Sequence, residues 1–209
     1  MDGVGTSRES QSDRVIYARQ SRLIMIISRA KTDIEGISLI ETEPLNDERG
    51  MFARLFCTSD LEVILEGRSI KQINTSHTKS KGSIRGLHFQ VPPRSEMKLI
   101  RCLKGAIWDV AVDLRSGSPT FLSSFGVRLS SENLTMLVIP EGFAHGFQTL
   151  EPDTELLYLH TEFYAPLLEG GVRFDDPIFD IKWPLTPSEV SERDKSHELI
   201  NHDFDGIKL

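Results

Sequence analysis

The sequence has few cysteines and no long hydrophobic run, and each absence excludes a class of protein. Its 209 residues include only two cysteines, Cys57 and Cys102. A disulfide framework therefore cannot hold the fold together, and we interpret both residues as buried free thiols. No apolar run approaches the ~18 residues of a membrane span, and residues 23–27 are too short for the core of a signal peptide. We expect a cytoplasmic protein with no membrane partner.

An excess of positive charge is also absent. The chain has 31 acidic and 24 basic residues, for a net charge of −7. Because proteins that bind phosphate backbones need clustered lysine and arginine, we expect no nucleic-acid partner. A small anionic ligand in a locally basic pocket stays possible. The sequence also lacks a glycine-rich phosphate loop, an alternation of strands and helices, and internal repeats.

The pattern along the chain predicts one all-β domain behind a polar tail. Residues 1–24 have mixed charge and no periodicity, which indicates a disordered tail, and we place a single domain at residues 25–209. Short strands are expected at 37–42, 51–57, 99–103, 106–114, 125–129, 136–139, 147–150 and 155–161, with a turn-rich loop at 44–50. Strands and turns at this spacing are typical of a sandwich or barrel.

Local signals add one hairpin and two short helices to this pattern. Lys104-Gly105 lies between two of the strands and predicts a β-hairpin. A helix is expected at residues 59–66, capped by Ser59, with Leu61, Ile64 and Leu65 as its apolar face. A second short helix is expected within residues 188–193.

Side chains that could carry chemistry fall on predicted strands. Because neighbouring side chains of a strand point to opposite faces, His88 should share a face with Gly86 and Gln90, opposite Arg85, Leu87 and Phe89. The same alternation groups Lys98 with Ile100 and Cys102, and Tyr158 with Leu156 and His160. His88 could be a core histidine or a base near neutral pH. Lys98 could be a surface residue or a cation aimed into a cavity, and Tyr158 a core aromatic or a proton donor.

Two of these segments together resemble the signature motifs of cupins, which are small jelly-roll barrels. They are Gly82-Ser-Ile-Arg-Gly-Leu-His-Phe-Gln90 and Pro140-Glu-Gly-Phe-Ala-His-Gly-Phe-Gln148. Metal-binding cupins use a second histidine where this chain has Gln90. A neutral amide is a poor ligand for a transition metal, and Lys98 would repel a divalent cation. We therefore expect a jelly-roll barrel with short peripheral helices, with no metal and no cofactor.

A longer series of segments resembles one cupin family, the dTDP-4-dehydrorhamnose 3,5-epimerases, which bind no metal. The resemblance extends over about residues 28–195. It is carried, in order, by Asn46-Asp-Glu-Arg-Gly50, Gln72-Ile-Asn74, Ile84 to Gln90, Lys98-Leu-Ile-Arg101, Asp109 to Thr120, Ile139 to Phe147, Tyr158, Phe163-Tyr-Ala-Pro166, Gly171 to Pro177 and Ile181-Lys-Trp-Pro-Leu185.

The resemblance implies an isomerase that inverts carbons C3 and C5 of a nucleotide-linked 4-keto-6-deoxyhexose without a cofactor. It assigns His88 as the general base, Asp194 as the carboxylate that holds this histidine, and Tyr158 as the proton donor. Lys98 would lie near the keto oxygen of the sugar. The 4-keto group acidifies the neighbouring C–H bonds, so the base can form an enolate that nearby donors stabilise.

The resemblance also implies a set of substrate-binding residues and a homodimer with shared active sites. Arg85 and His145 would line the sugar pocket, and the ring of Tyr164 would stack on the nucleotide base. The nucleotide or its diphosphate would contact Arg49, Gln72, Asn74, Glu169 and Arg193. With Arg54, the arginines and Lys98 would form a basic pocket for the diphosphate of the nucleotide sugar.

Two departures from the family keep alternatives open. Arg54 follows the Asn46–Gly50 segment where the family commonly has a glutamate, which makes CDP- or GDP-linked sugars candidates beside dTDP. Arg193 stands where a lysine is common. The alternatives are an enzyme that inverts only C3 or only C5, a keto-isomerase of a CDP- or GDP-linked sugar, and a non-catalytic sugar-binding cupin.

Overall fold

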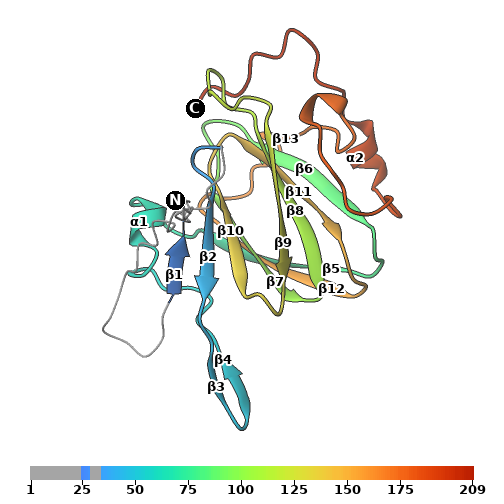
Figure 1. The fold of residues 1–209 in the computed structure, drawn as a ribbon. Coiled ribbons are helices and arrows are strands. Elements are labelled where there is room, and N and C mark those ends of the chain that lie inside the picture. The colour runs from blue at the N-terminus through green and yellow to red at the C-terminus, as the bar shows by residue number, and fades with distance from the viewer. Residues whose placement is uncertain (1–24, 29–33) are drawn as a thin grey trace, which may run out of the picture.

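The computed structural model of the chain describes residues 25–28 and 34–209, and the tail predicted for residues 1–24 lies outside them. Two antiparallel sheets and a projecting hairpin contain the described strands (Figure 1). The first sheet has the order β1 (Met25–Ser28), β2 (Ser38–Thr42), β10 (Thr135–Ile139), β7 (Lys98–Lys104), β12 (Thr154–His160) and β5 (Gln72–Thr78). The second has the order β13 (Glu169–Gly171), β6 (Ile84–Gln90), β11 (Phe143–Thr149), β8 (Ala106–Asp113) and β9 (Ser124–Ser130). The all-β prediction is confirmed.

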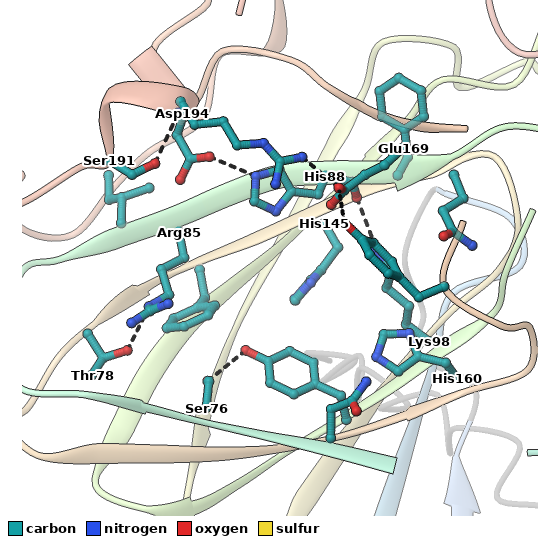
Figure 2. Close-up of a pocket in the computed structure, with 18 of the residues that line it drawn as sticks. Ser76, Thr78, Arg85, His88, Lys98, His145, His160, Glu169, Ser191 and Asp194 are labelled. Atoms are coloured by element: carbon teal, nitrogen blue, oxygen red, sulfur yellow. Dashed lines mark hydrogen bonds and ion pairs between the residues drawn. The ribbon is translucent and has the colours of Figure 1, made fainter. Parts of the chain in front are cut away.

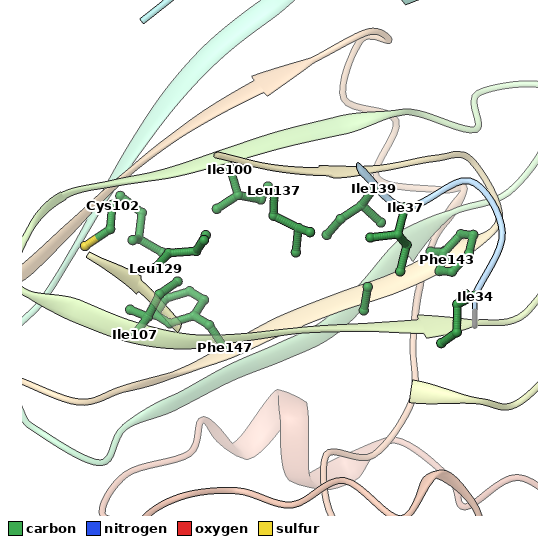
Figure 3. Packing of buried hydrophobic residues seen from close by; sticks show 12 residues of the cluster. Ile34, Ile37, Ile100, Cys102, Ile107, Leu129, Leu137, Ile139, Phe143 and Phe147 are labelled. Carbon is green, nitrogen blue, oxygen red and sulfur yellow. The ribbon is translucent and has the colours of Figure 1, made fainter. Parts of the chain in front are cut away.

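The main apolar core lies between the two sheets (Figure 3). Ile100, Leu137 and Leu156 of the first sheet pack in one cluster with Ile107 and Phe147 of the second. The predicted alternation explains this packing. Ile100 and Cys102 share a face of β7, and both side chains belong to the cluster. Burial of these side chains supplies the main driving force that holds the sheets face to face.

The outer faces of both sheets are also covered. Helix α1 (Glu62–Leu65) places Leu61 and Leu65 against Leu99 and Met136 of the first sheet. Val110 and Val112 of β8 pack under the C-terminal segment, which contains a 3-10 turn (Pro177–Phe179) and helix α2 (Glu192–Ser196). Both faces of β8 are therefore buried, and its alternation separates two cores rather than core from solvent.

The prediction of a β-hairpin at Lys104-Gly105 is wrong. Strand β7 pairs with β10 and β12 in the first sheet, whereas β8 pairs with β9 and β11 in the second. The turn carries the chain from one sheet to the other. A local turn signal does not reveal this arrangement, because it does not show that β7 pairs with the distant strands β10 and β12 while β8 pairs with β9 and β11.

Several predicted boundaries also need correction. The loop expected at 44–50 contains β3 (Leu45–Asp47), which pairs with β4 (Gly50–Phe52), and the strand expected at 51–57 ends at Phe52. Helix α1 begins only at Glu62 and has no side-chain cap, because the Ser59 hydroxyl contacts the Cys57 thiol instead.

The C-terminal helix begins later than predicted. Ser191 caps α2 by accepting a hydrogen bond from the backbone of Asp194. Residues 188–190 run beside β6 instead, where the amide of Ile84 donates to the Glu189 carbonyl. In the described part of the chain, no helix has the length and apolar character needed to cross a bilayer.

A bulge in β6 changes the predicted alternation of its side chains. His145 of β11 pairs with His88, but Phe147 pairs with Arg85, so the register shifts between them. Arg85 and His88, which strict alternation places on opposite faces, consequently both line the same cavity. The shift occurs at Gly86, which has a φ of +115° and lies against Gly146 of the neighbouring strand.

We expect Gly86→Ala to destabilise the fold more than a matched glycine substitution does. A Cβ at Gly86 would lie 2.6 Å from the Gly146 Cα, whereas a Cβ at Gly67, with a φ of +82°, would meet no atom within 4 Å. Gly67→Ala should cost about 1–2 kcal/mol of unfolding free energy for its backbone conformation, and Gly86→Ala about 1–3 kcal/mol more for overpacking. Urea unfolding of the two variants measures the difference, and equal losses would contradict the close-packing argument.

Candidate active site

A cavity of about 850 Å³ lies at the polar end of the space between the sheets (Figure 2). Strands of both sheets and the C-terminal segment contribute to its wall. Eleven of the thirteen predicted site residues line it: Gln72, Asn74, Arg85, His88, Lys98, His145, Tyr158, Tyr164, Glu169, Arg193 and Asp194. The fold therefore brings most of the predicted site residues together around one cavity.

His88 and Asp194 form a hydrogen-bonded pair in the cavity wall. The His88 Nε2 lies 2.7 Å from the Asp194 Oδ1, and the other carboxylate oxygen accepts from the Gly86 amide at 3.3 Å. Burial alone would raise the pKa of Asp194, but the hydrogen bond and charge of His88 lower it overall. An ionised Asp194 accepts a hydrogen bond from the Nε2–H of His88, which orients the imidazole and leaves Nδ1 as its basic nitrogen.

Tyr158 approaches the cavity from the opposite sheet. Its hydroxyl shares a hydrogen bond of 3.0 Å with the Ser76 hydroxyl on the neighbouring strand. Burial raises the pKa of Tyr158 well above its ordinary value. The phenol therefore keeps its proton at neutral pH and can act as a donor.

His145 stands between these two groups. Its Nε2 lies 2.6 Å from the Asp109 Oδ1, and both side chains are buried. Its ring meets the ring of Tyr158 edge to face, with centroids 6.3 Å apart. Asp109 thus fixes a second imidazole, whose ring lies against Tyr158.

Lys98 projects from the start of β7 into the same space (Figure 2). The ammonium donates to the His88 carbonyl oxygen at 3.0 Å and lies 3.4 Å from the Glu96 Oε1. Only 7% of the residue is exposed. The alternative of a surface lysine is thereby excluded.

Polar side chains at the rim hold one another in place. The Tyr164 hydroxyl donates to the Glu169 Oε2 at 2.9 Å, and Arg193 forms an ion pair with the same oxygen at 2.8 Å. On the opposite side, Asn74 donates to the Gln72 Oε1 at 3.3 Å. Such exposed pairs contribute little to stability, so these side chains remain available to a ligand.

Gln90, which stands where metal-binding cupins have a second histidine, uses its side chain for hydrogen bonds to the backbone. The Gln90 amide donates to the Arg94 carbonyl at 2.8 Å, and its oxygen accepts from the Ala165 amide at 2.7 Å. Within the described residues, His88, Asp194 and His197 form a group that could offer metal ligands, with ligand atoms within 4.8 Å of one another. The absence of a metal and of a cofactor stays a prediction.

Comparisons with known proteins identify the family. The family model for dTDP-4-dehydrorhamnose 3,5-epimerase matches residues 31–202. A dTDP-4-dehydrorhamnose 3,5-epimerase from Shigella flexneri is 41% identical over 176 residues, which are 83% of this chain and 97% of the relative. This chain belongs to the dTDP-4-dehydrorhamnose 3,5-epimerase family. It is accordingly an isomerase with the cupin jelly-roll fold.

Solved structures agree with the family assignment. The dTDP-6-deoxy-D-glucose-3,5-epimerase of Legionella pneumophila Philadelphia 1, in complex with dTDP-4-keto-L-rhamnose, is 38% identical with a TM-score of 0.79, and the match covers 84% of this chain and 92% of that one. A 3'-monoepimerase from Streptomyces bikiniensis in complex with dTDP-quinovose is 31% identical with a TM-score of 0.75, and the match covers 80% and 85%.

Arg49 and Arg54 are the two predicted site residues that do not line the cavity. Arg49 lies at the turn of the β3–β4 hairpin, 90% exposed and paired with Asp47. Arg54 is paired with Asp60 at 2.6 Å. Within this chain, neither arginine reaches the cavity.

Sequence reasoning missed Glu96 and His160 as residues of the candidate site. Both line the cavity, and His160 Nδ1 lies 2.9 Å from the Glu96 Oε2. The signal was present, because His160 shares a predicted strand face with Tyr158. Asp109 was also missed, because nothing in the local sequence indicated a histidine partner.

The His88 contact should be visible in the titration of Asp194. We expect the pKa of Asp194, which is lowered in the native protein, to rise in His88→Ala, because the burial that opposes ionisation then acts without the histidine. Carbon-13 NMR of the carboxyl groups measures it. The control is His77→Ala, which removes an exposed histidine that pairs with Asp153 and should leave the Asp194 titration unchanged. An unaltered titration in His88→Ala would contradict this account.

Proposed function

We propose that this chain inverts C3 and C5 of a dTDP-linked 4-keto-6-deoxyhexose by proton transfer through an enolate, with no cofactor. The observation that carries the proposal is the placement of His88, held by Asp194, on one sheet and Tyr158 on the other, across one cavity. Inversion of a carbon needs a base on one face of the sugar ring and an acid on the other. A cavity between two sheets can hold the ring between them.

The steps follow from the protonation states. The free nitrogen of His88 takes the proton from the carbon next to the ketone, and the electron pair moves to the keto oxygen. Lys98, whose ammonium is held in the cavity, stabilises the enolate oxygen. Tyr158 then donates its proton to the opposite face of the carbon. Because His88 and Tyr158 exchange their protons with water, each turnover at a carbon can carry solvent hydrogen into the product.

Arg85 is suited to the diphosphate. Its Nε donates to the Thr78 hydroxyl at 3.0 Å and its Nη2 to the His77 carbonyl at 3.4 Å, so these contacts leave its charge unbalanced. Lys98 and Arg193 instead lie beside Glu96 and Glu169. A guanidinium with uncharged partners can bind phosphate oxygens without first losing a carboxylate.

Arg54 is the residue that raises the question of which nucleotide is bound. The reversed charge at this position makes CDP- and GDP-linked sugars candidates, but the Arg54 guanidinium is paired with Asp60 and lies outside the cavity. The charge is balanced within the chain, so it gives no reason for a different nucleotide. The relatives named above support dTDP.

An enzyme that inverts only C3 is the second candidate. The similarity to the Streptomyces bikiniensis 3'-monoepimerase favours it. The same base and acid would serve in both cases, and the difference would lie in how far the sugar can turn between them.

We also interpret residues 25–209 as one domain. The absence of a nucleic-acid partner and the cytoplasmic location stay predictions.

We expect His88→Ala to lower solvent deuterium incorporation at C3 and C5 at least about 10³-fold, because no other group at that position removes the proton. Tyr158→Phe should retain exchange but lose inversion, since the enolate can be reprotonated from the His88 side. NMR of a dTDP-4-keto-6-deoxyhexose incubated in heavy water measures both.

The control for this experiment is again His77→Ala, which should exchange at the wild-type rate. Exchange at C3 alone in the wild type would favour the monoepimerase. CDP- and GDP-linked sugars in parallel samples test the nucleotide. Full exchange by His88→Ala would sink the assignment of the base, and exchange by no wild-type sample would sink the enzyme.

We further propose a homodimer in which the β3–β4 hairpin of one copy reaches the cavity of the other. The hairpin projects away from the sheets (Figure 1). It exposes the apolar side chains Leu45, Met51 and Phe52, which a second copy could cover. The same contact would bring Arg49, which is remote from the cavity of its own chain, toward a bound diphosphate.

Mixing two damaged chains tests the shared site. Arg49→Ala and Lys98→Ala should each be nearly inactive alone, but co-expression should restore up to about a quarter of the wild-type rate. Half of the dimers would then be mixed, and each of these would contain one undamaged site. Co-expression of Arg85→Ala with Lys98→Ala is the control. Each substitution damages the cavity of its own chain, so no dimer of the two variants contains an undamaged site. Recovery in neither mixture would contradict the shared site.

A further inference from the structure

A buried carboxylate lies beside the lysine of the site. Glu96 comes just before β7, and only 8% of its side chain is exposed. One carboxylate oxygen lies 3.4 Å from the Lys98 ammonium and the other 2.9 Å from the His160 Nδ1. Both oxygens are therefore engaged by cationic or donor groups of the protein, which fixes the orientation of the carboxylate.

The charge of Glu96 is maintained in spite of its burial. Burial by itself would raise the pKa of Glu96, but the His160 hydrogen bond and the Lys98 charge lower it overall. A buried ammonium is costly unless an opposite charge lies close. Of the acidic groups in the described residues, Glu96 is the one that forms an ion pair with Lys98.

His160 connects this carboxylate to the acid of the reaction. Because Glu96 is an acceptor, His160 donates from Nδ1. Its ring stacks on the ring of Tyr158, with centroids 6.1 Å apart and planes 20° apart. Only 13% of the His160 side chain is exposed. An ion pair from Lys98 to Glu96 and a hydrogen bond from Glu96 to His160 thus connect the ammonium to the residue that stacks on Tyr158.

We propose that Glu96 and His160 form a positioning pair, which holds the Lys98 ammonium at the keto oxygen and the Tyr158 ring at its donating angle. The inference rests on the proposed function and deepens it. Neither residue touches the reacting carbon. Glu96 keeps one Lys98 donor engaged, the His88 carbonyl engages a second, and the third remains for the substrate.

The main test is Glu96→Gln, which keeps the size of the side chain and removes its charge. We expect kcat to fall about 10- to 100-fold, because a displaced cation stabilises the enolate poorly, while KM changes less than about threefold. Glu151→Gln is the matched control. Glu151 lies in a turn outside the cavity, with an ion pair of 3.9 Å to Arg128, and its substitution should leave kcat unchanged.

A double-mutant cycle separates positioning from a general structural role. In a Lys98→Met background, Glu96→Gln should lower the residual kcat by a clearly smaller factor than in the wild-type background, because one of the two groups through which Glu96 acts is gone. Equal losses in both backgrounds would overturn the proposal, as would an unaltered kcat in Glu96→Gln.

A second pair of variants tests His160 if Glu96→Gln fails to fold. His160→Asn keeps a donor near the Nδ1 position and should retain kcat within about fivefold, whereas His160→Phe keeps the ring but loses the donor and should resemble Glu96→Gln. Equal activity of the two His160 variants would overturn the role of the hydrogen bond.

A measurement without substrate distinguishes the failure of this inference from the failure of the proposed function. The Lys98 ammonium should give a slowly exchanging proton–nitrogen NMR signal in the wild type, and it should be lost in Glu96→Gln but not in Glu151→Gln. A wild type with this signal but no epimerase activity would overturn the proposed function alone. An active wild type whose signal survives Glu96→Gln would overturn the positioning pair alone.

Discussion

The hydrogen bond between His88 and Asp194 joins two parts of the chain that are 106 residues apart, and the site depends on it. It ties the C-terminal segment to β6 and so closes one wall of the cavity. Ser191, which begins α2, places the Asp194 carboxylate by capping its backbone amide. The contact that orients the His88 imidazole therefore also helps to hold this wall of the cavity, beside the backbone hydrogen bond from Ile84 to Glu189.

The same strands that carry the site also carry the core, and their alternation sets the depth of each residue. Along β7, Lys98 lies in the cavity, while Ile100 and Cys102 lie in the apolar cluster. Strand β12 repeats the pattern with Tyr158 and Leu156. Polar residues at one end of each inward face thus lie next to the packed apolar cluster. This cluster fixes the strands without occupying the space that a sugar needs.

Regular strands could be predicted from the sequence, and irregular ones could not. The inward faces of β7, β8 and β12 follow from a period of two. That period fails at β6, where the bulge beside Gly86 brings Arg85 and His88 to one cavity. The period also cannot say which strands pair, so the turn at Lys104-Gly105 predicts a hairpin although it joins two sheets. These features depend on contacts across the fold.

The proposed catalytic residues could be predicted only through the family's motifs, since each alone has an ordinary structural explanation. What the motifs could not supply was the pairing of charges. The sequence indicates a basic pocket of five cations, but Arg49, Arg54, Lys98 and Arg193 each lie beside a carboxylate in the folded chain. A count of basic residues therefore overstates the attraction for a diphosphate. The balance inside the cavity depends on the geometry of each pair, and Arg85, whose hydrogen bonds go to uncharged groups, gains importance that its motif alone does not give it.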